Sequence, residues 1–91
     1  MTWLARVHVV LKSIVNDPQG EAITGGLRSL GFSGVSQVRA GKYMEIRLDA
    51  GDKSDAEHQV DDMCRKLLAN PVIEDYHIEV ERLATPPRDA V

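Results

Sequence analysis

The sequence predicts a small α+β domain of the split βαβ, or ferredoxin-like, kind: a two-layer sandwich in which two helices cover one face of a four-stranded antiparallel sheet. Three observations support this prediction. The chain has 91 residues, the size of one domain. Apolar residues alternate with polar ones in some segments and recur every three or four residues in two others. In order, these segments are strand, helix, strand, strand, helix, strand, and they occupy residues 1–82.

The first strand and the first helix come from the opening third of the chain. Residues 3–12 alternate, with apolar side chains on one side. Asp17 can accept the N–H groups of a first helical turn, and Pro18 fits the first helical position because an N–H there would be unpaired anyway. The helix is expected to stop at Gly31. Its inward stripe is Ile23, Leu27 and Leu30.

Two adjacent glycines inside this helix, Gly25 and Gly26, require an explanation. Each costs about 1 kcal/mol relative to alanine in a helix interior. We expect the helix backbone to approach the sheet or another subunit closely here, because a missing side chain is useful where something else must come near.

The centre of the chain, residues 35–48, predicts a hairpin. A tight turn is expected at residues 40–42, with an extended segment before it and a strand after it. Val35 and Val38 break strict alternation, which indicates a bulge or a twist before the turn. The buried side of the strand after the turn is Met44, Ile46 and Leu48.

The second helix has the clearest start in the chain. Ser54 and Glu57 have the spacing of a capping box, in which each side chain satisfies a backbone N–H of the other. The helix ends at Asn70–Pro71, a last strand follows over residues 72–82, and residues 83–91 have the composition of a mobile tail. The inward stripe of the helix is Val60, Met63, Cys64, Leu67 and Leu68.

Composition and charge exclude several classes of function. The net charge is −3 and basic residues are not clustered, which argues against nucleic-acid binding. No apolar run approaches the roughly 20 residues of a membrane helix. The first residues lack the pattern of a secretory signal, so we expect a cytoplasmic protein. The single cysteine, Cys64, has no partner for an internal disulfide, and its place in a helix stripe favours a packed thiol.

Residue spacing indicates no catalytic or metal-binding set. His8, His58 and His77 are far apart and fall on predicted polar faces, so neither a zinc site nor a nucleophile with its base is indicated. The chain has no P-loop and no glycine fingerprint after a strand. Neighbouring acidic residues lie on solvated faces or point apart. These observations predict a small interaction module.

One concentration of polar side chains remains, around the predicted turn and the start of the first helix. Arg39 could hold a carboxylate or phosphate with two hydrogen bonds, and Lys42 offers a point charge. A plain solvated hairpin tip fits the same residues equally well. The concentration consists of Asp17, Gln19, Arg39, Lys42, Glu45 and Arg47.

Three separated blocks of sequence resemble one known family. They are Asp17-Pro18-Gln19-Gly20, then Val-Arg-Ala-Gly-Lys-Tyr-Met-Glu at residues 38–45, and Met-Cys-Arg-Lys-Leu-Leu-Ala-Asn-Pro-Val-Ile-Glu-Asp-Tyr at residues 63–76. Together they are similar to the PurS subunit of phosphoribosylformylglycinamidine (FGAM) synthase. The resemblance covers about residues 4–82 in order. A single block would be weak, and the agreement of three is specific.

The resemblance implies a non-catalytic subunit in purine biosynthesis. In that family, a PurL synthetase subunit binds ATP and magnesium and performs the amidation, while a PurQ glutaminase subunit supplies ammonia. The small subunit is expected to bind no cofactor itself, to form a homodimer or homotetramer, to bridge PurL and PurQ, and to support ammonia transfer. Its candidate interface residues are Asp17, Gln19, Arg39, Gly41, Lys42 and Glu45.

Two other functions stay open at this point. A ferredoxin-like sensor would use the helix ends and a dimer interface as a ligand pocket, and it predicts saturable binding of an amino acid or nucleotide. A binder of single-stranded nucleic acid would need aromatic side chains on the open sheet face. Only Tyr43 meets that requirement.

Overall fold

The structure, a computed structural model, describes residues 1–84, in which helices and strands alternate. Within these residues it has three strands, two α-helices and one π-helical turn that continues the second helix. The elements are β1 (Thr2–Leu11), α1 (Pro18–Ser29), β2 (Gly41–Asp49), α2 (Lys53–Met63), η1 (Cys64–Leu68) and β3 (Glu74–Arg82). The tail predicted over residues 83–91 lies largely outside the described residues. Leu83, its first residue, still donates its N–H to the carbonyl oxygen of Thr2, 3.0 Å away.

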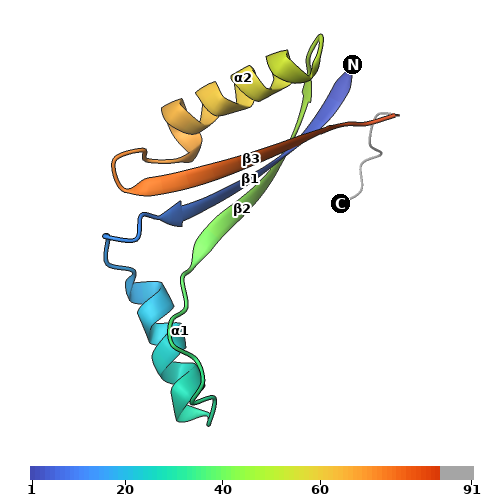
Figure 1. Cartoon of the computed structure of the whole chain (residues 1–91). Coiled ribbons are helices and arrows are strands. Elements are labelled where there is room, and N and C mark those ends of the chain that lie inside the picture. The colour runs from blue at the N-terminus through green and yellow to red at the C-terminus, as the bar shows by residue number, and fades with distance from the viewer. Residues whose placement is uncertain (85–91) are drawn as a thin grey trace.

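The three strands form one antiparallel sheet in the order β2–β1–β3 (Figure 1). β1 is the central strand and pairs with a neighbour along both edges. Val7 lies opposite Met44 on β2 and Ile78 on β3. Since side chains alternate along a strand, this register places the apolar positions of all three strands on one face.

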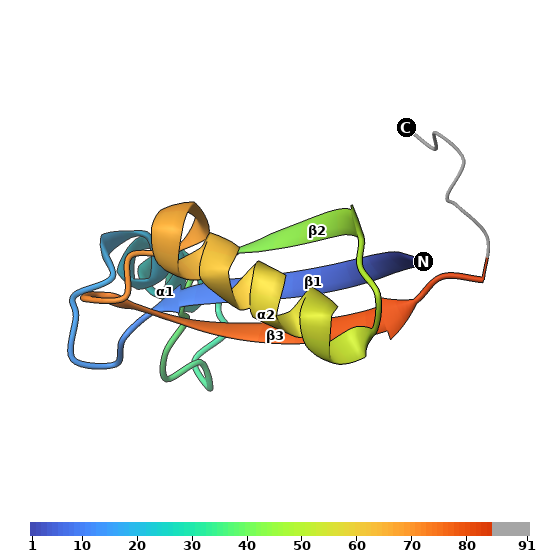
Figure 2. The same cartoon turned by 90° about the horizontal axis from the view of Figure 1, so that it is seen from above.

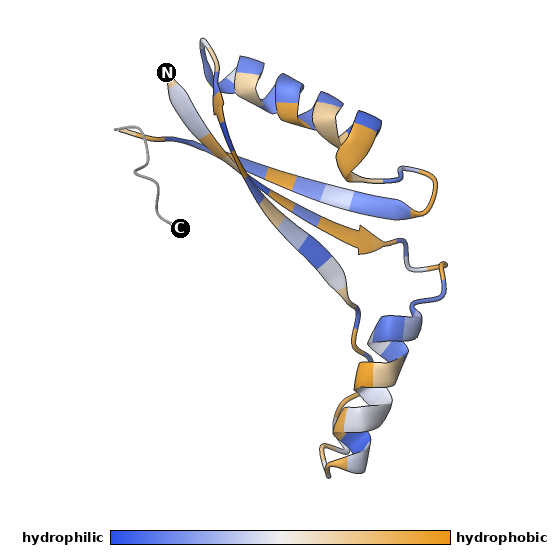
Figure 3. Cartoon of the chain, turned by 180° about the vertical axis from the view of Figure 1, so that it is seen from behind, coloured by the Kyte–Doolittle hydropathy of each residue, from blue (hydrophilic) through white to orange (hydrophobic). Residues whose placement is uncertain are grey.

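The core forms where α2 crosses that apolar face, mainly over β1 and β3 (Figure 2). Its largest fully buried side chains are Val7, Val9, Val60 and Cys64. In Figure 3 the most apolar residues are concentrated in the second half of β1 and the last turns of the α2–η1 helix. Burial of such side chains, worth roughly 1.5 to 3 kcal/mol each for a valine or larger, holds this helix to the sheet.

α1 begins and ends where the sequence predicts. The side chain of Asp17 accepts the N–H of Gly20 and caps the first turn, and Pro18 is the first helical residue. Gly31 follows the helix with a φ of 102°, in the left-handed region that glycine adopts without strain.

The α+β class and the antiparallel sheet are confirmed, whereas the prediction of four strands is wrong for residues 1–84. The expected hairpin is missing. Residues 35–40 form no strand, and β2 already begins at Gly41, where we predicted the turn.

Side chains of α1 explain why residues 35–40 do not join a sheet. Thr24 Oγ1 accepts a hydrogen bond from the N–H of Val38 at 2.9 Å. Arg28 donates to the carbonyl oxygens of Val35, at 2.8 Å, and Ser36, at 3.2 Å. These backbone groups are thereby satisfied without a neighbouring strand.

α1 does not lie on the sheet, so the prediction that two helices cover one face is wrong. The helix leaves the sheet where β1 ends and β2 begins, and it points away from α2 (Figure 1). Two of the three residues of its predicted inward stripe are exposed, with Ile23 40 % and Leu30 76 % accessible, and Leu27 is half-buried. A Cβ on Gly25 or Gly26 would meet nothing within 4 Å, so neither glycine approaches the sheet. We call residues 12–40, which comprise α1 and its two connections, the arm.

The cap of α2 lies two residues upstream of the predicted capping box. Asp52 accepts the N–H of Asp55 at 2.8 Å, and the Asp55 carboxylate accepts the N–H of Gly51 at 3.3 Å. Ser54 and Glu57 are therefore not the capping pair. Aspartate caps a helix as well as serine does, so the spacing alone did not distinguish the two pairs.

The last turn of the second helix is wider than predicted. Ala69 donates its N–H to the carbonyl oxygen of Cys64 at 3.0 Å, the five-residue hydrogen bond of a π-helix. The wider turn changes the direction of the side chains. Cys64 stays buried, whereas Leu67, predicted to face inward, is 83 % exposed.

Gly41 should tolerate no side chain. A Cβ there would lie 2.3 Å from the carbonyl oxygen of Val9 and 2.8 Å from Cγ1 of Val10. Gly41→Ala should lower the free energy of unfolding by about 1 to 3 kcal/mol, measured by urea denaturation. Gly51→Ala is the matched control, because a Cβ at Gly51 meets nothing within 4 Å. Equal stability of the two variants would contradict this packing.

Candidate functional site

Asp17 ties the start of α1 to the residue just before β2, and its charged side chain is buried. Oδ1 accepts the N–H of Gly20 at 3.0 Å, at the start of α1, and Oδ2 accepts the N–H of Ala40 at 2.9 Å, just before β2. The two backbone donors, Gly20 first, hold the pKa of Asp17 below its ordinary value because they favour the ionised carboxylate. One carboxylate thus joins the two ends of the arm.

Arg39 holds the same junction from the end of β1. Its guanidinium donates to the carbonyl oxygens of Leu11 and, at 3.0 Å, Lys12. Its positive charge also helps to lower the pKa of Asp17. Since Arg39 already satisfies two backbone carbonyls, its first role is to hold the arm rather than to grip a ligand.

The remaining candidate residues do not form one patch. Gln19 is exposed on the first turn of α1. Lys42 and Glu45 are exposed and lie three positions apart on β2, so they point to opposite faces of the sheet. Glu45 accepts a hydrogen bond from the Tyr43 hydroxyl at 2.8 Å. The candidate set therefore divides into Asp17, Arg39 and Gly41 at the arm junction, and Gln19, Lys42 and Glu45 on exposed surfaces.

A polar hollow of about 470 Å³ is lined by one side of α1, by residues 13–17 before it and by residues 36–39 after it. It is the place where a small-molecule sensor would bind. The cations among its described lining residues are Arg28 and Arg39, and both already donate to backbone carbonyls of the chain. The hollow is therefore poorly equipped to receive an anionic ligand.

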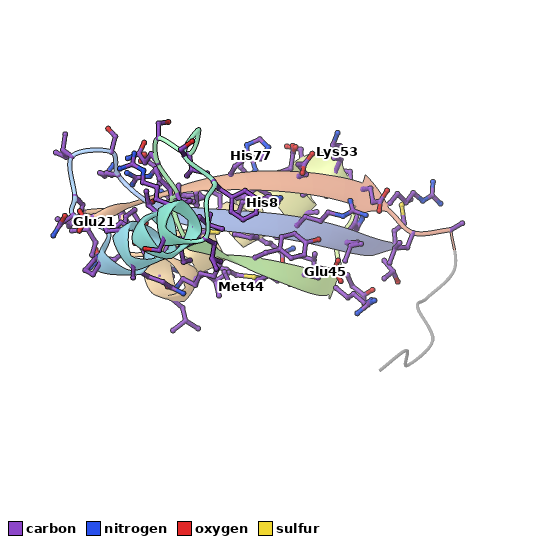
Figure 4. The ribbon with its side chains drawn as sticks, turned by 90° about the horizontal axis from the view of Figure 1, so that it is seen from below. His8, Glu21, Met44, Glu45, Lys53 and His77 are labelled. Carbon is purple, nitrogen blue, oxygen red and sulfur yellow. The ribbon has the colours of Figure 1, made fainter. Side chains whose placement is uncertain are left out.

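The sheet face opposite α2 carries a row of titratable side chains that sequence spacing did not reveal. His8 on β1 lies between Tyr43 on β2 and His77 on β3, with ring centroids 4.9 and 6.2 Å away (Figure 4). Nε2 of His8 is 3.6 Å from a carboxylate oxygen of Glu79. Alternation predicted the polar face for the two histidines, but only the strand register brings them together.

Reactive groups are few in residues 1–84. Cys64 is fully buried, and burial raises the pKa of its thiol. Across this part of the chain, no three His, Cys, Asp or Glu side chains are placed to hold a metal ion. Nor does any helix here have the length and apolarity to cross a membrane.

The sheet, the single covering helix and the projecting arm define a small α+β interaction domain. Comparison with known proteins identifies its family. The family model of PurS, described as phosphoribosylformylglycinamidine (FGAM) synthase, matches residues 4–82. The chain belongs to the PurS family of FGAM synthase subunits.

Similar proteins match almost the whole chain. The FGAM synthase subunit PurS of Synechocystis is 51 % identical over 82 residues, which are 90 % of this chain and 82 % of that protein. The Bacillus subtilis PurS structure is 48 % identical, with a TM-score of 0.79 over 88 % of this chain and 99 % of that one. A chain of the PurLQS structure from Thermotoga maritima is 32 % identical, with a TM-score of 0.82 over 89 % of this chain and 99 % of that one. The resemblance seen in the three sequence blocks is confirmed.

Asp17→Asn tests the arm junction. One carboxylate oxygen becomes an NH₂ group, which cannot accept a hydrogen bond. One of the two backbone N–H groups, that of Gly20 or that of Ala40, therefore loses its acceptor. We expect the melting temperature at pH 7 to fall by roughly 5 °C. Because the pKa of Asp17 is lowered on folding, its carboxylate stabilises the fold above its ordinary pKa near 4, and this stabilisation is lost as the pH falls further.

Thermal unfolding followed by circular dichroism at pH 7 and at about pH 3 provides the measurement. The difference between wild type and Asp17→Asn should be large at pH 7 and smaller near pH 3. Glu57→Gln, a change at an exposed carboxylate of α2, is the control and should have little effect. A difference independent of pH would contradict the role given to the ionised carboxylate.

Cys64 should be unreactive in the folded protein. Its burial blocks access, and its raised pKa lowers the fraction of thiolate, the reactive form. A thiol-specific disulfide reagent at pH 8 should modify the native protein at least about tenfold more slowly than the protein unfolded in urea. Equal rates in the two conditions would show that the thiol is accessible.

Proposed function

We propose that this chain is the non-catalytic subunit of FGAM synthase that bridges the PurL synthetase and the PurQ glutaminase in purine biosynthesis and supports ammonia transfer between them. The observation that carries the proposal is the match to a chain of the PurLQS structure from Thermotoga maritima. The match covers 99 % of that chain. A bridging subunit needs contact surfaces rather than a reactive centre. The described residues fit that need, since Arg39 and Asp17 are used to hold the arm and Cys64 is buried.

The proposal divides the chemistry among the subunits. ATP and magnesium belong to PurL and glutamine hydrolysis to PurQ, so this chain binds no cofactor of its own. A homodimer or homotetramer of the chain is part of the proposal, because the protomer leaves Ile23 and Leu30 of its arm exposed. The cytoplasmic location expected from the sequence belongs to the same proposal.

Co-purification tests the bridge. The tagged full-length chain is mixed with PurL and PurQ of the same organism, the retained proteins are identified, and FGAM formation is assayed with glutamine and with ammonia. We expect both partners to be retained. Glutamine-dependent amidation should require the chain, whereas ammonia-dependent amidation by PurL should persist without it. Turnover by the chain alone, or full glutamine-dependent activity in its absence, would contradict the proposal.

Lys42→Glu separates a contact role from a folding role. Lys42 is exposed, so the free energy of unfolding should stay within about 0.5 kcal/mol of wild type while retention of a partner subunit weakens. Arg39→Ala is the comparison, because it removes the hydrogen bonds to Leu11 and Lys12 and should lower stability and retention together. If Lys42→Glu left both complex formation and glutamine-dependent activity unchanged, Lys42 would be excluded as a contact.

A further inference from the structure

The polar hollow of the arm has walls that are held in place by hydrogen bonds. One wall is residues 36–39, whose backbone is bound by Thr24 and Arg28 of α1. Asp17 binds the residue directly after this wall, and Arg39 ties the wall to the end of β1. A surface fixed in this way is already formed before anything binds to it, which lowers the entropic cost of binding.

Most of the residues around the hollow are polar. Pockets for small molecules are mainly apolar, with a few polar groups that fix the orientation of the ligand. Contacts between separate proteins, in contrast, are about as polar as the rest of a protein surface. The lining therefore favours a segment of another protein over a small molecule. Its uncharged polar residues are Ser13, Asn16, Thr24, Ser36 and Gln37.

Gly25 lines the hollow without a role in its own chain. A glycine in the interior of a helix lowers the stability of that helix. A Cβ at Gly25 would meet nothing within 4 Å, so no neighbour among residues 1–84 requires the missing side chain. A missing side chain lets another backbone approach the helix closely. Gly25 therefore indicates that a segment from outside the chain enters the hollow.

The charge left without a partner in the hollow is negative. Its described charged residues are Asp17, Glu21, Arg28 and Arg39. Asp17 accepts two backbone N–H groups, and both arginines donate to backbone carbonyls. Glu21, on α1 beside the loop that enters the helix (Figure 4), makes no ion pair within residues 1–84. A carboxylate with free lone pairs is the complement of a lysine or arginine side chain.

The hollow lies away from the apolar stripe of α1. Glu21, Gly25 and Arg28 line the hollow, whereas Ile23 and Leu30 are on the other side of a helix with 3.6 residues per turn. An occupant of the hollow therefore displaces nothing that covers the stripe.

We propose that the hollow receives a loop of one of the two larger subunits, PurL or PurQ, whose backbone lies against Gly25 and whose lysine or arginine pairs with Glu21. Polar groups of the same loop bind the amides and hydroxyls of the lining. This inference rests on the bridging role proposed above. It adds the surface of this chain that makes the contact and the chemistry of the segment that the surface binds.

Filling the hollow tests the inference without disturbing the fold. Gly25→Leu places a side chain in the hollow, where a Cβ meets nothing. Ala22→Leu is the matched control, because Ala22 is also exposed on α1 and lies outside the lining. The full-length chain is titrated with an equimolar mixture of PurL and PurQ, and the binding of each is measured. Gly25→Leu should raise the dissociation constant of one partner at least about tenfold, and Ala22→Leu should leave both within about twofold of wild type.

Charge reversal tests the pairing with Glu21. Glu21→Lys should raise the dissociation constant of the same partner at least about tenfold, because it places two positive charges side by side. Glu57→Lys, the same change at an exposed position of α2, should leave that constant within about twofold of wild type. Circular dichroism verifies that every variant is folded.

Crosslinking identifies the segment that enters the hollow. A photoreactive group is attached at Gln37→Cys, at the hollow, or at Ser33→Cys, an exposed position outside its lining, before the three proteins are mixed. Cys64 is fully buried, so the label goes to the introduced cysteine. The label at residue 37 should join a peptide of PurL or PurQ that contains lysine or arginine, and the label at residue 33 should join little of that peptide.

The outcomes separate this inference from the bridging role. Wild-type dissociation constants for both Gly25→Leu and Glu21→Lys, with no crosslink from residue 37, would overturn the inference while the bridging role stands. Failure of the wild-type chain to bind PurL and PurQ would overturn the bridging role and the inference together. Saturable binding of free arginine or spermidine that Gly25→Leu abolishes, with partner binding unchanged, would make the hollow a small-molecule site and would also overturn the inference.

Discussion

The hydrogen bonds of the Asp17 carboxylate are the constraint on which the rest of the structure depends. The carboxylate accepts the N–H of Gly20 at the start of α1 and the N–H of Ala40 before β2, and it is buried. A buried charge is tolerated only when it is paired or hydrogen-bonded, and here both donors are backbone groups in fixed positions. The two ends of the arm are therefore held together, and α1 stays off the sheet.

This constraint divides the molecule into two parts that are stabilised by different interactions. α2 and the sheet bury a conventional core around Val7 and Val60. The arm is held mainly by polar groups, such as Arg28 and Thr24, which bind the backbone of residues 35–40. Apolar side chains on the arm and beside α2, among them Leu30 and Leu67, stay exposed in the single chain.

The ends of α1 could be predicted from the sequence, whereas the positions of α1 and of residues 35–40 relative to the sheet could not. Asp17 and Gly31 marked the ends of α1 because capping depends on neighbouring residues. Residues 35–40 have a composition compatible with a strand, yet Arg28 and Thr24 of the preceding helix bind their backbone groups, and the alternation pattern does not reveal this. The stripe of α1 has the same spacing whether it covers its own sheet or another surface. For the candidate site, Asp17 and Arg39 were identified, but their joint role needed the structure, and the approach of His8 to His77 needed the strand register.

The most direct measurement of the central claim is the distance within one chain between the end of α1 and the start of α2. Spin labels at Leu30→Cys and Lys53→Cys, diluted with an excess of unlabelled chains, report this distance by double electron–electron resonance. An arm held away from the sheet predicts a long separation, comparable with the 49 Å long dimension of the chain. A short separation, on the order of 20 Å as for two helices packed side by side on one sheet, would contradict it.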